Sequence, residues 1–429
     1  MAAGLTRPFS IGGLEVPNRL YRAPLLECAG NGAGAVETLI GELEPAAASG
    51  AGLIFQGATI VREEGGCAAP NMTRVADREF VSELAALTDR IHAHGVTIAI
   101  QLEHGGLRSR EVWHAGYRDE ADEQLAVSRP PWPLRVLDRA GLIELSPHVM
   151  STAEVRELAA DFGRSAAWAV EAGYDAVHLA GANMGIVQQF LSPFYNRRDD
   201  AFADGVRFLE AIHEEVRERA GDVPLVTKVP DETPAPVRRR LSTDDAVSIA
   251  RRLERIGYDA VVPVRTSVFW DASIVRGSFP DRAWNDEALG EAYAEAFGGR
   301  IRTRLLALGN RIQSRLYDFE PGRNEELCRR VSATVSIPVL MEGGIRERDQ
   351  IDRLLDSGVC DAVGIGRPFY AEPRLPARLL AGGDAICESC NNCVVPQAAG
   401  EPGVCRTPAV LERRGTLEGE NAYERPGEG

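Results

Sequence analysis

The sequence lacks a surplus of basic residues, a membrane-length apolar run and a secretory leader. Its 429 residues include 48 lysines and arginines against 63 aspartates and glutamates, for a formal net charge of −15. A chain this acidic is a poor partner for nucleic acid or an anionic membrane surface. The amino terminus, MAAGLTRPFSIGG, has no apolar core of the kind found in signal peptides. These absences predict a cytoplasmic protein that acts on a small molecule.

The sequence also lacks the fingerprint G-x-G-x-x-G at the start of a helix, which marks doubly wound sheets that bind dinucleotides. Short apolar strands instead alternate with amphipathic helices. Eight such strands predict an α/β fold, a closed (β/α)8 TIM barrel preceded by a short hairpin, with an open doubly wound sheet as the runner-up. The predicted strands are LYRAPLLE, GLIFQGA, VTIAIQLEHGG, YDAVHLAG, PLVTKVPDE, YDAVVPVRTS, IPVLMEGG and CDAVGIGRP.

Two stretches interrupt this alternation. Residues 107–150 are rich in Arg, Pro and Trp, and a loop of this length is usually a lid or a substrate-binding excursion. Residues 268–325 form a second irregular region. The predicted division is a barrel over residues 1–380, a cysteine-rich loop over 381–410 and a charged, disordered tail over 411–429.

The last strand–helix–strand unit of the barrel ends both of its strands in glycine. Backbone N–H groups approach a phosphate closely only where no Cβ intervenes. The loops after strands seven and eight are the usual phosphate site of this fold. The unit therefore predicts a phosphorylated cofactor, with glycines that merely turn the chain as the alternative. The residues expected to bind it are Gly343, Gly344, Gly364, Gly366 and Arg367.

Gln101 and Lys228 are polar residues on otherwise apolar strands. A glutamine amide donates and accepts hydrogen bonds at once, which suits a flat heterocycle with alternating N–H and C=O edges. A lysine buried without a partner is costly, so Lys228 is expected to face an anionic or electron-rich group such as a reduced flavin. Structural filling of the barrel is the alternative for both residues.

Four of the eight cysteines crowd near the carboxyl end of the chain. Cys387, Cys390, Cys393 and Cys405 have the spacing C-x2-C-x2-C-x11-C, which is typical of a cluster-binding loop closed by a distant fourth ligand. In a reducing compartment such a group indicates metal binding before disulfides. The pattern predicts a [4Fe–4S] cluster, with a zinc site of four thiolates or reduced, unoccupied cysteines as the alternatives.

Six motifs together resemble the old yellow enzyme family of FMN-dependent oxidoreductases. The resemblance implies a barrel that binds FMN at its carboxyl face, where the flavin takes a hydride from NAD(P)H and passes it to an activated alkene. The motifs are VPNRLYRAP, GLIFQGATIVREEG, IAIQLEHGG, QQFLSPFYNRRDD, IPVLMEGGI and DAVGIGRPFYAEP.

The resemblance assigns residues of this chain to parts of the flavin. Lys228 takes the N1/O2 side of the ring, where the family usually has arginine, and Gly344, Gly366 and Arg367 hold the phosphate. The residues expected along the ring and its edge are Ala23, Pro24, Leu25, Ala58 and Gln101.

The stretch HLAGANMGIVQQF after the fourth strand departs from the family. The family usually places a histidine pair, or His-x-x-Asn, there to bind the substrate carbonyl, with a tyrosine two residues on to supply a proton. Here Ala180 and Asn183 stand at the pair, which leaves Asn183 as its one hydrogen-bond donor and a catalytic candidate, and Gly185 replaces the tyrosine. The standard enone reaction is expected to be impaired unless another group substitutes, since an oxyanion donor commonly contributes about 2–4 kcal/mol.

The candidate substitutes are His178, His104 and Tyr195, and His178 has barrel filling as its alternative. Leu26, where relatives often carry cysteine or threonine, removes a further polar contact near the flavin. Trp132, Phe269 and Trp270 are candidates for an aromatic wall around a flat apolar substrate or a methylated amine, with ordinary packing as the alternative. Arg265 is a candidate for binding a carboxylate or the phosphate.

The cysteine loop and the opening NRLYRAP resemble the branch that contains 2,4-dienoyl-CoA reductase and trimethylamine dehydrogenase. Those relatives continue into a part that binds an adenine dinucleotide, whereas only AVLERRGTLEGENAYERPGEG follows the cysteine loop here. We therefore expect electrons to come from NAD(P)H or from a separate electron-transfer protein, with a structural remnant as the alternative for the cluster.

Three hypotheses follow. The leading one is a flavin- and cluster-dependent oxidoreductase acting on a C=C bond next to a carbonyl, which rests on the six motifs. The second is a dehydrogenase that oxidises a C–N bond, suggested by the amino terminus and the lost carbonyl-binding pair. The third is a flavin protein without redox turnover, either an isomerase or a redox-sensing partner, suggested by the missing tyrosine. A homo-oligomer is expected in each case.

Overall fold

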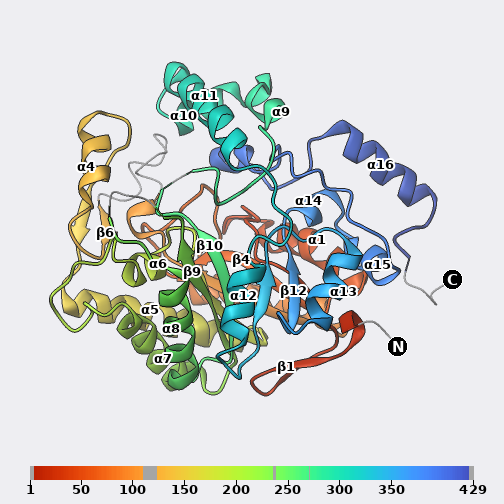
Figure 1. The fold of residues 1–429 in the computed structure, drawn as a ribbon, viewed down its shortest axis with the longest axis horizontal. Coiled ribbons are helices and arrows are strands. Elements are labelled where there is room, and N and C mark those ends of the chain that lie inside the picture. Colours follow the sequence, from red (N-terminus) through yellow and green to blue (C-terminus); the bar gives the residue numbers. More distant parts are fainter. Residues whose placement is uncertain (1–3, 110–122, 235–237, 270, 425–429) are drawn as a thin grey trace.

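The computed structural model describes residues 4–109, 123–234, 238–269 and 271–424, and its centre is a sheet of eight parallel strands (Figure 1). The strand order is β10-β9-β8-β5-β4-β3-β12-β11. A parallel bridge between Val261 and Val339 joins the two ends of this order, so the sheet closes. The predicted (β/α)8 barrel is confirmed. Its strands are β3 (Leu20–Arg22), β4 (Leu53–Ile60), β5 (Thr97–Glu103), β8 (Ala176–Leu179), β9 (Leu225–Glu232), β10 (Ala260–Thr266), β11 (Leu340–Glu342) and β12 (Ala362–Ile365).

Helices surround the barrel (Figure 1). Two of the longer ones begin at capping boxes, in which Ser151 and Ser242 each accept from the N–H three residues on, which satisfies donors that a helix start leaves free. No helix in the described ranges has both the length and the apolar character needed to cross a bilayer. The surrounding helices are α1 (Ala35–Ala48), α2 (Arg78–Glu83), α3 (Ala85–His92), α5 (Thr152–Glu171), α6 (Ile186–Leu191), α7 (Val206–Ala220), α8 (Thr243–Ile256), α12 (Glu325–Ser332), α13 (Arg348–Asp356), α14 (Pro368–Ala371) and α15 (Leu375–Leu380).

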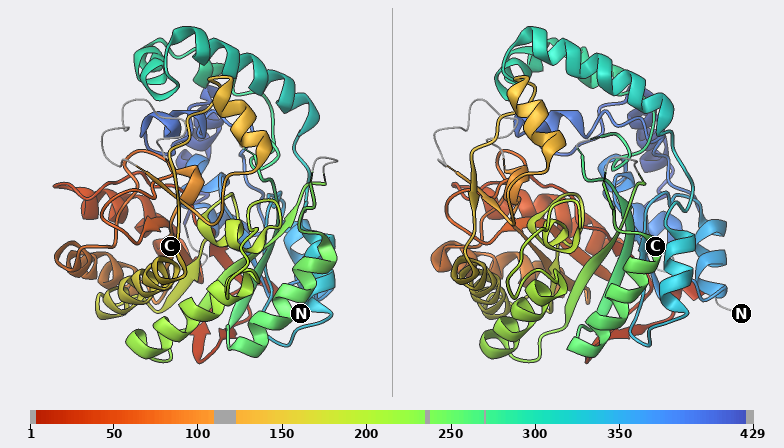
Figure 2. Two further views of the ribbon diagram at one scale, coloured as in Figure 1. Left: turned by 90° about the vertical axis from the view of Figure 1, so that its left-hand side faces the viewer. Right: turned by 60° about the vertical axis from the view of Figure 1, so that its left-hand side comes forward.

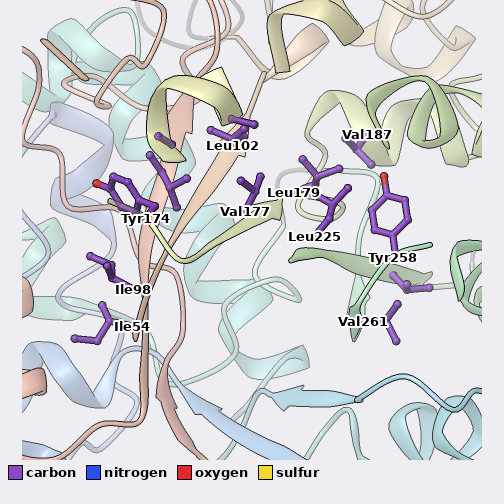
Figure 3. Close-up of a cluster of buried hydrophobic side chains, with 14 of the residues drawn as sticks. Ile54, Ile98, Leu102, Tyr174, Val177, Leu179, Val187, Leu225, Tyr258 and Val261 are labelled. Carbon is purple, nitrogen blue, oxygen red and sulfur yellow. The ribbon is translucent and has the colours of Figure 1, made fainter. Parts of the chain in front are cut away.

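Successive side chains of each strand point alternately out to the helices and into the barrel. The outward set packs under the helices and includes Ile54, Ile98, Val177, Leu225 and Val261 (Figure 3). A separate inward cluster fills the lower part of the barrel. Polar side chains that also point inward, but lie further along the same strands, therefore line the carboxyl end of the barrel. The inward cluster includes Leu53, Phe55, Ala99, Ala176, Val226, Leu340 and Ala362.

The predicted hairpin is present, and the first interruption contains more regular structure than expected. Strands β1 (Phe9–Ile11) and β2 (Leu14–Val16) pair antiparallel, and their apolar side chains pack against the inward cluster. In the first interruption, β6 (Gln124–Ala126) pairs with β7 (Pro147–Val149), with α4 (Trp132–Arg139) between them.

The predictions of an irregular second interruption and a disordered tail are wrong for the residues described. The interruption contains α9 (Asp281–Trp284), α10 (Gly290–Ala296) and the 17-residue α11 (Arg300–Leu316). The cysteine-rich loop leads into α16 (Pro408–Gly419), and Val410 and Tyr423 are buried against the body of the chain. Polar composition pointed to disorder, but these few apolar contacts fix the tail.

Candidate active site

Gln101, His178 and Lys228 point into the barrel near its carboxyl end, because they share the inward phase on neighbouring strands. The Gln101 amide nitrogen is 2.8 Å from His178 Nδ1. An amide nitrogen only donates, so Nδ1 accepts and Nε2 carries the proton. Nε2 is buried and has no hydrogen-bond partner among the described residues. Burial lowers the pKa of His178 well below its usual value, and Lys228 lowers it further, so this imidazole is neutral.

Lys228 already has an anionic partner within the chain. Its Nζ lies 2.7 Å from Oε2 of Glu342 on β11, and both side chains are almost fully buried. The Tyr21 hydroxyl lies 3.5 Å from the other carboxylate oxygen, and burial together with Glu342 raises the pKa of Tyr21. Sequence reasoning missed Glu342. The signal was available, because an isolated acid in IPVLMEGG and an isolated lysine in VTKVP are charges that burial drives together.

Four arginines gather beside the glycine ends of β11 and β12. Burial and the charges of Arg276, Arg367 and Arg265 lower the pKa of Arg323 to about 10. The Nε atoms of Arg276 and Arg323 are buried without a hydrogen-bond partner in the described ranges. Clustered cations with free donors fit a phosphate dianion, so these residues fit the phosphate of FMN. Arg276 and Arg323 lie in the second interruption and were missed.

The glycines at these strand ends are needed by the chain itself. A Cβ at Gly344, where φ is +71°, would lie 2.1 Å from the Glu320 carbonyl oxygen. A Cβ at Gly364 would lie 2.2 Å from the Tyr21 ring. Packing therefore explains both glycines, whatever else they bind. The binding roles of Gly343 and Gly366 stay predictions.

The loop of residues 23–26 borders the same end of the barrel. The Ala23 N–H donates to the Ile365 carbonyl at 2.9 Å. The Leu26 carbonyl accepts from the Tyr370 hydroxyl at 3.1 Å and from the Gln397 amide at 2.8 Å. These bonds fix the segment that carries Pro24 and Leu25. Across the sheet, Ala58 of β4 pairs in register with Gln101 after an irregularity in the strand.

A buried acid, Glu103, stands beside the position where the tyrosine of the resembled family is missing. A Cβ at Gly185 would lie 3.1 Å from Oε1 of Glu103. One Arg108 nitrogen is 3.4 Å from the same oxygen and 2.7 Å from the Asn183 carbonyl. Burial raises the pKa of Glu103, against Arg108 and Lys228, which lower it. Sequence reasoning missed Glu103 and Arg108, although Glu103 follows Gln101 by two residues and so shares its inward phase.

Comparison with known proteins agrees with this geometry. Residues 4–287 match the model of the "NADH:flavin oxidoreductase / NADH oxidase family". The chain belongs to this family. The predicted resemblance is thereby confirmed.

Two curated proteins and one solved structure illustrate the similarity. The chain is 28% identical to "N,N-dimethylglycine/sarcosine dehydrogenase" of Chromohalobacter salexigens, over 95% of this chain and 53% of that protein. It is 24% identical to "Metal reductase" of Desulforamulus reducens, over 91% of this chain and 50% of that protein. The structure of 2-naphthoyl-CoA reductase with 2-naphthoyl-CoA matches with a TM-score of 0.74 and 17% identity, over 99% of this chain and 58% of that one. The chain thus spans little more than half the length of these proteins.

Within this family member, the other predicted catalytic residues are dispersed. Asn183 has φ of +58° and lies beside Arg108 through its carbonyl. The Tyr195 hydroxyl donates to the Val268 carbonyl at 2.6 Å inside an apolar cluster, so its proton is already engaged in a hydrogen bond. His104 accepts from the N–H of Gly106, and burial lowers its pKa to about 3. The geometry supports neither Tyr195 nor His104 as the substitute proton donor.

The predicted substrate residues do not gather either. Trp132 begins α4 with 49% of its side chain exposed. Arg265, the candidate for binding a carboxylate or the phosphate, lies 3.6 Å from Asp231 and belongs to the arginine cluster. Phe269 packs edge-on against Phe194. Trp270 lies outside the described residues.

The four cysteines line one pocket between α14 and α16. Burial, with a smaller contribution from the other three thiols, raises the pKa of the Cys393 thiol to about 12, although Arg367 lowers it. No three His, Cys, Asp or Glu side chains of the described chain meet closely enough to hold a single metal ion. Arg367 also lines this pocket, where it donates to the side chain of Asn391 and to the Arg276 carbonyl. The thiols therefore share one pocket beside the arginine cluster.

Proposed function

We propose that this chain is a flavin- and cluster-dependent oxidoreductase that transfers a hydride between FMN and a C=C bond conjugated to a carbonyl or carboxylate. The observation that carries the proposal is the buried Glu103 beside Gly185, with Arg108 next to it. This arrangement supplies an acid and a cation at the place where the family's tyrosine and carbonyl-binding pair are absent.

FMN, when bound, supplies the two-electron carrier. Gln101 and Lys228 would hold its ring, and the four arginines would hold its phosphate. Arg108 binds the carbonyl or carboxylate oxygen of the substrate. Glu103, whose pKa burial raises, delivers a proton to the alkene carbon that does not receive the hydride. The relative whose structure contains 2-naphthoyl-CoA, a conjugated thioester, supports this substrate class.

We further propose that Cys387, Cys390, Cys393 and Cys405 bind a [4Fe–4S] cluster. The four thiols line one pocket, yet they do not converge on a point where a single ion would sit. A tetrahedral zinc site requires that convergence, whereas a cubane binds each thiolate at a different iron. A zinc site made of the same four thiolates is the alternative.

A dehydrogenase for N-methylated amino acids is the second candidate. The relative named for N,N-dimethylglycine and sarcosine aligns over 95% of this chain, and Arg108 suits the carboxylate of such a substrate as well as that of an unsaturated acid. Anaerobic additions to the oxidised protein separate the two. Bleaching of the flavin by sarcosine or dimethylglycine favours the amine reaction. Bleaching by NAD(P)H, followed by reoxidation with cinnamate or an enoyl thioester, favours the alkene reaction.

The first test is an anaerobic visible spectrum with flavin, iron and acid-labile sulfide measured on the same sample. The proposal expects flavin bands over an iron–sulfur shoulder, with about four irons per FMN. If the protein takes up no flavin, the proposed function is contradicted. Flavin that no donor reduces supports the flavin protein without redox turnover.

Replacing Glu342 by glutamine is expected to raise the reduction potential of bound FMN. The amide keeps the shape of the carboxylate, but it leaves the Lys228 charge unmatched beside a ring that becomes negative on reduction. A tenfold preference for the reduced flavin corresponds to about 30 mV. Dye-linked anaerobic titration measures the shift. Glu347→Gln, which changes an exposed acid on the loop that follows β11, is the matched control, and an unchanged potential in Glu342→Gln contradicts the assignment.

A further inference from the structure

Large apolar side chains that are exposed in the described part of the chain gather on two neighbouring segments. Six lie on α11 and four lie between the start of α4 and the end of β7, whereas Val404 lies elsewhere. Arg302 of α11 donates to the Leu142 carbonyl, so the segments touch, and Figure 2 shows them at the same end of the molecule. Monomeric proteins rarely expose apolar side chains in such a group. The residues are Trp132, Val136, Leu142, Val149, Ile301, Leu305, Leu306, Leu308, Ile312 and Leu316.

Helix α11 presents its apolar stripe to solvent. Ile301, Leu305, Leu308 and Ile312 follow one another at intervals of four, three and four residues, which places them on one face. Within the described chain, α11 buries only Ser314, and Ile301 is 78% exposed. A helix in a protein gains most of its stability from packing an apolar face. The stripe is therefore built to be covered by a partner.

The charges around the stripe suit a second copy of the same surface. Helix α11 carries five arginines and no acid, whereas residues 286–295 just before it carry four acids and no basic residue. Within one copy, Arg300 and Glu291 approach to 3.7 Å while both stay largely exposed. A face that holds both signs side by side complements itself about a two-fold axis. The net charge of −15 opposes an anionic membrane as the occupant.

We propose that two copies of this chain associate about a two-fold axis through the α11 stripe and the adjoining face of α4. The four apolar side chains of the α11 stripe form the centre of the contact. The arginines of α11 lie against the acidic residues that precede α11 in the other copy. This proposal is independent of the proposed function, since it involves none of the residues assigned to the flavin or the cluster.

Sedimentation velocity on the full chain at micromolar concentration tests the proposal. The wild type is expected at twice the chain mass. The double variant Leu305→Glu and Leu308→Glu is expected to raise the dissociation constant about a hundredfold or more, since it replaces two central apolar anchors. Leu306→Glu is the matched control, because Leu306 is 42% exposed on the same helix but lies off the stripe. It is expected to stay dimeric. Circular dichroism and the flavin spectrum verify that each variant folds.

A monomeric wild type overturns the proposal, and so does a double variant that dimerises as well as the wild type. A monomer that instead co-sediments with phosphatidylglycerol vesicles overturns it in favour of a membrane surface. Flavin and iron contents, measured on the same samples, report separately on the proposed function.

Discussion

The Glu103→Gln variant is expected to transfer hydride to conjugated substrates about 10²–10⁴-fold more slowly than the wild type, the range that a positioned general acid supplies. Glu103 is 5% exposed, and its Oε1 faces Gly185 and Arg108. The amide preserves this shape but has no acidic proton. Flavin reduction by NAD(P)H needs no proton from this group and is expected to be unchanged. Rapid mixing separates the two half-reactions.

The pH dependence of the second half-reaction sharpens this test. Burial raises the pKa of Glu103, so the proton is held at pH values where an ordinary carboxyl group has lost it. The rate is expected to be full below the raised pKa and to fall as the pH rises through it. Glu103→Gln removes this limb, whereas Glu63→Gln, an exposed acid near the same end of the barrel, keeps it. A wild-type rate in Glu103→Gln, or a limb that survives there, contradicts the role.

The Cys393→Ala variant is expected to lose its iron and its acid-labile sulfide. Cys393 is the most buried of the four thiols, at 9% exposure, and its removal opens one corner of the cluster to water. Iron is expected to fall from about four per chain to less than one. Cys28→Ala is the control, because Cys28 is half-buried and lies outside the cysteine loop. Full iron content in Cys393→Ala, or zinc in the wild type at one ion per chain, contradicts the cluster.

The barrel was predictable from sequence because each strand is a local pattern. The inward phase that carries Gln101 and Lys228 is visible as alternation within a single strand. The ion pair of Lys228 was not predicted, since Glu342 lies 114 residues away and only closure of the barrel brings the two together. Glu103 was visible as an acid on an apolar strand, but only the fold shows that it lies beside Gly185 and Arg108.

The structure of the second interruption, residues 268–325, could not be predicted from the sequence for two physical reasons. Its longest helix, α11, packs its apolar stripe against nothing within the described chain, so the usual match between pattern and core is absent. Arg276 and Arg323 become candidate phosphate ligands only because the fold brings them beside the glycine ends of β11 and β12. Arginines in irregular segments are normally solvated, and no local pattern distinguishes these two.

Arg367 links two sites that a sequence presents as separate. It lies in the arginine cluster, and it donates to Asn391 within the cysteine-rich loop. A group bound at one site therefore restrains a side chain that also serves the other site. Any resulting change in affinity for the second group is matched by an equal change in affinity for the first. If FMN and the cluster bind as proposed, we expect a chain that has acquired one of them to bind the other more readily during maturation. Protein that holds only one of the two groups is then expected to be rarer than it would be if the two groups bound independently.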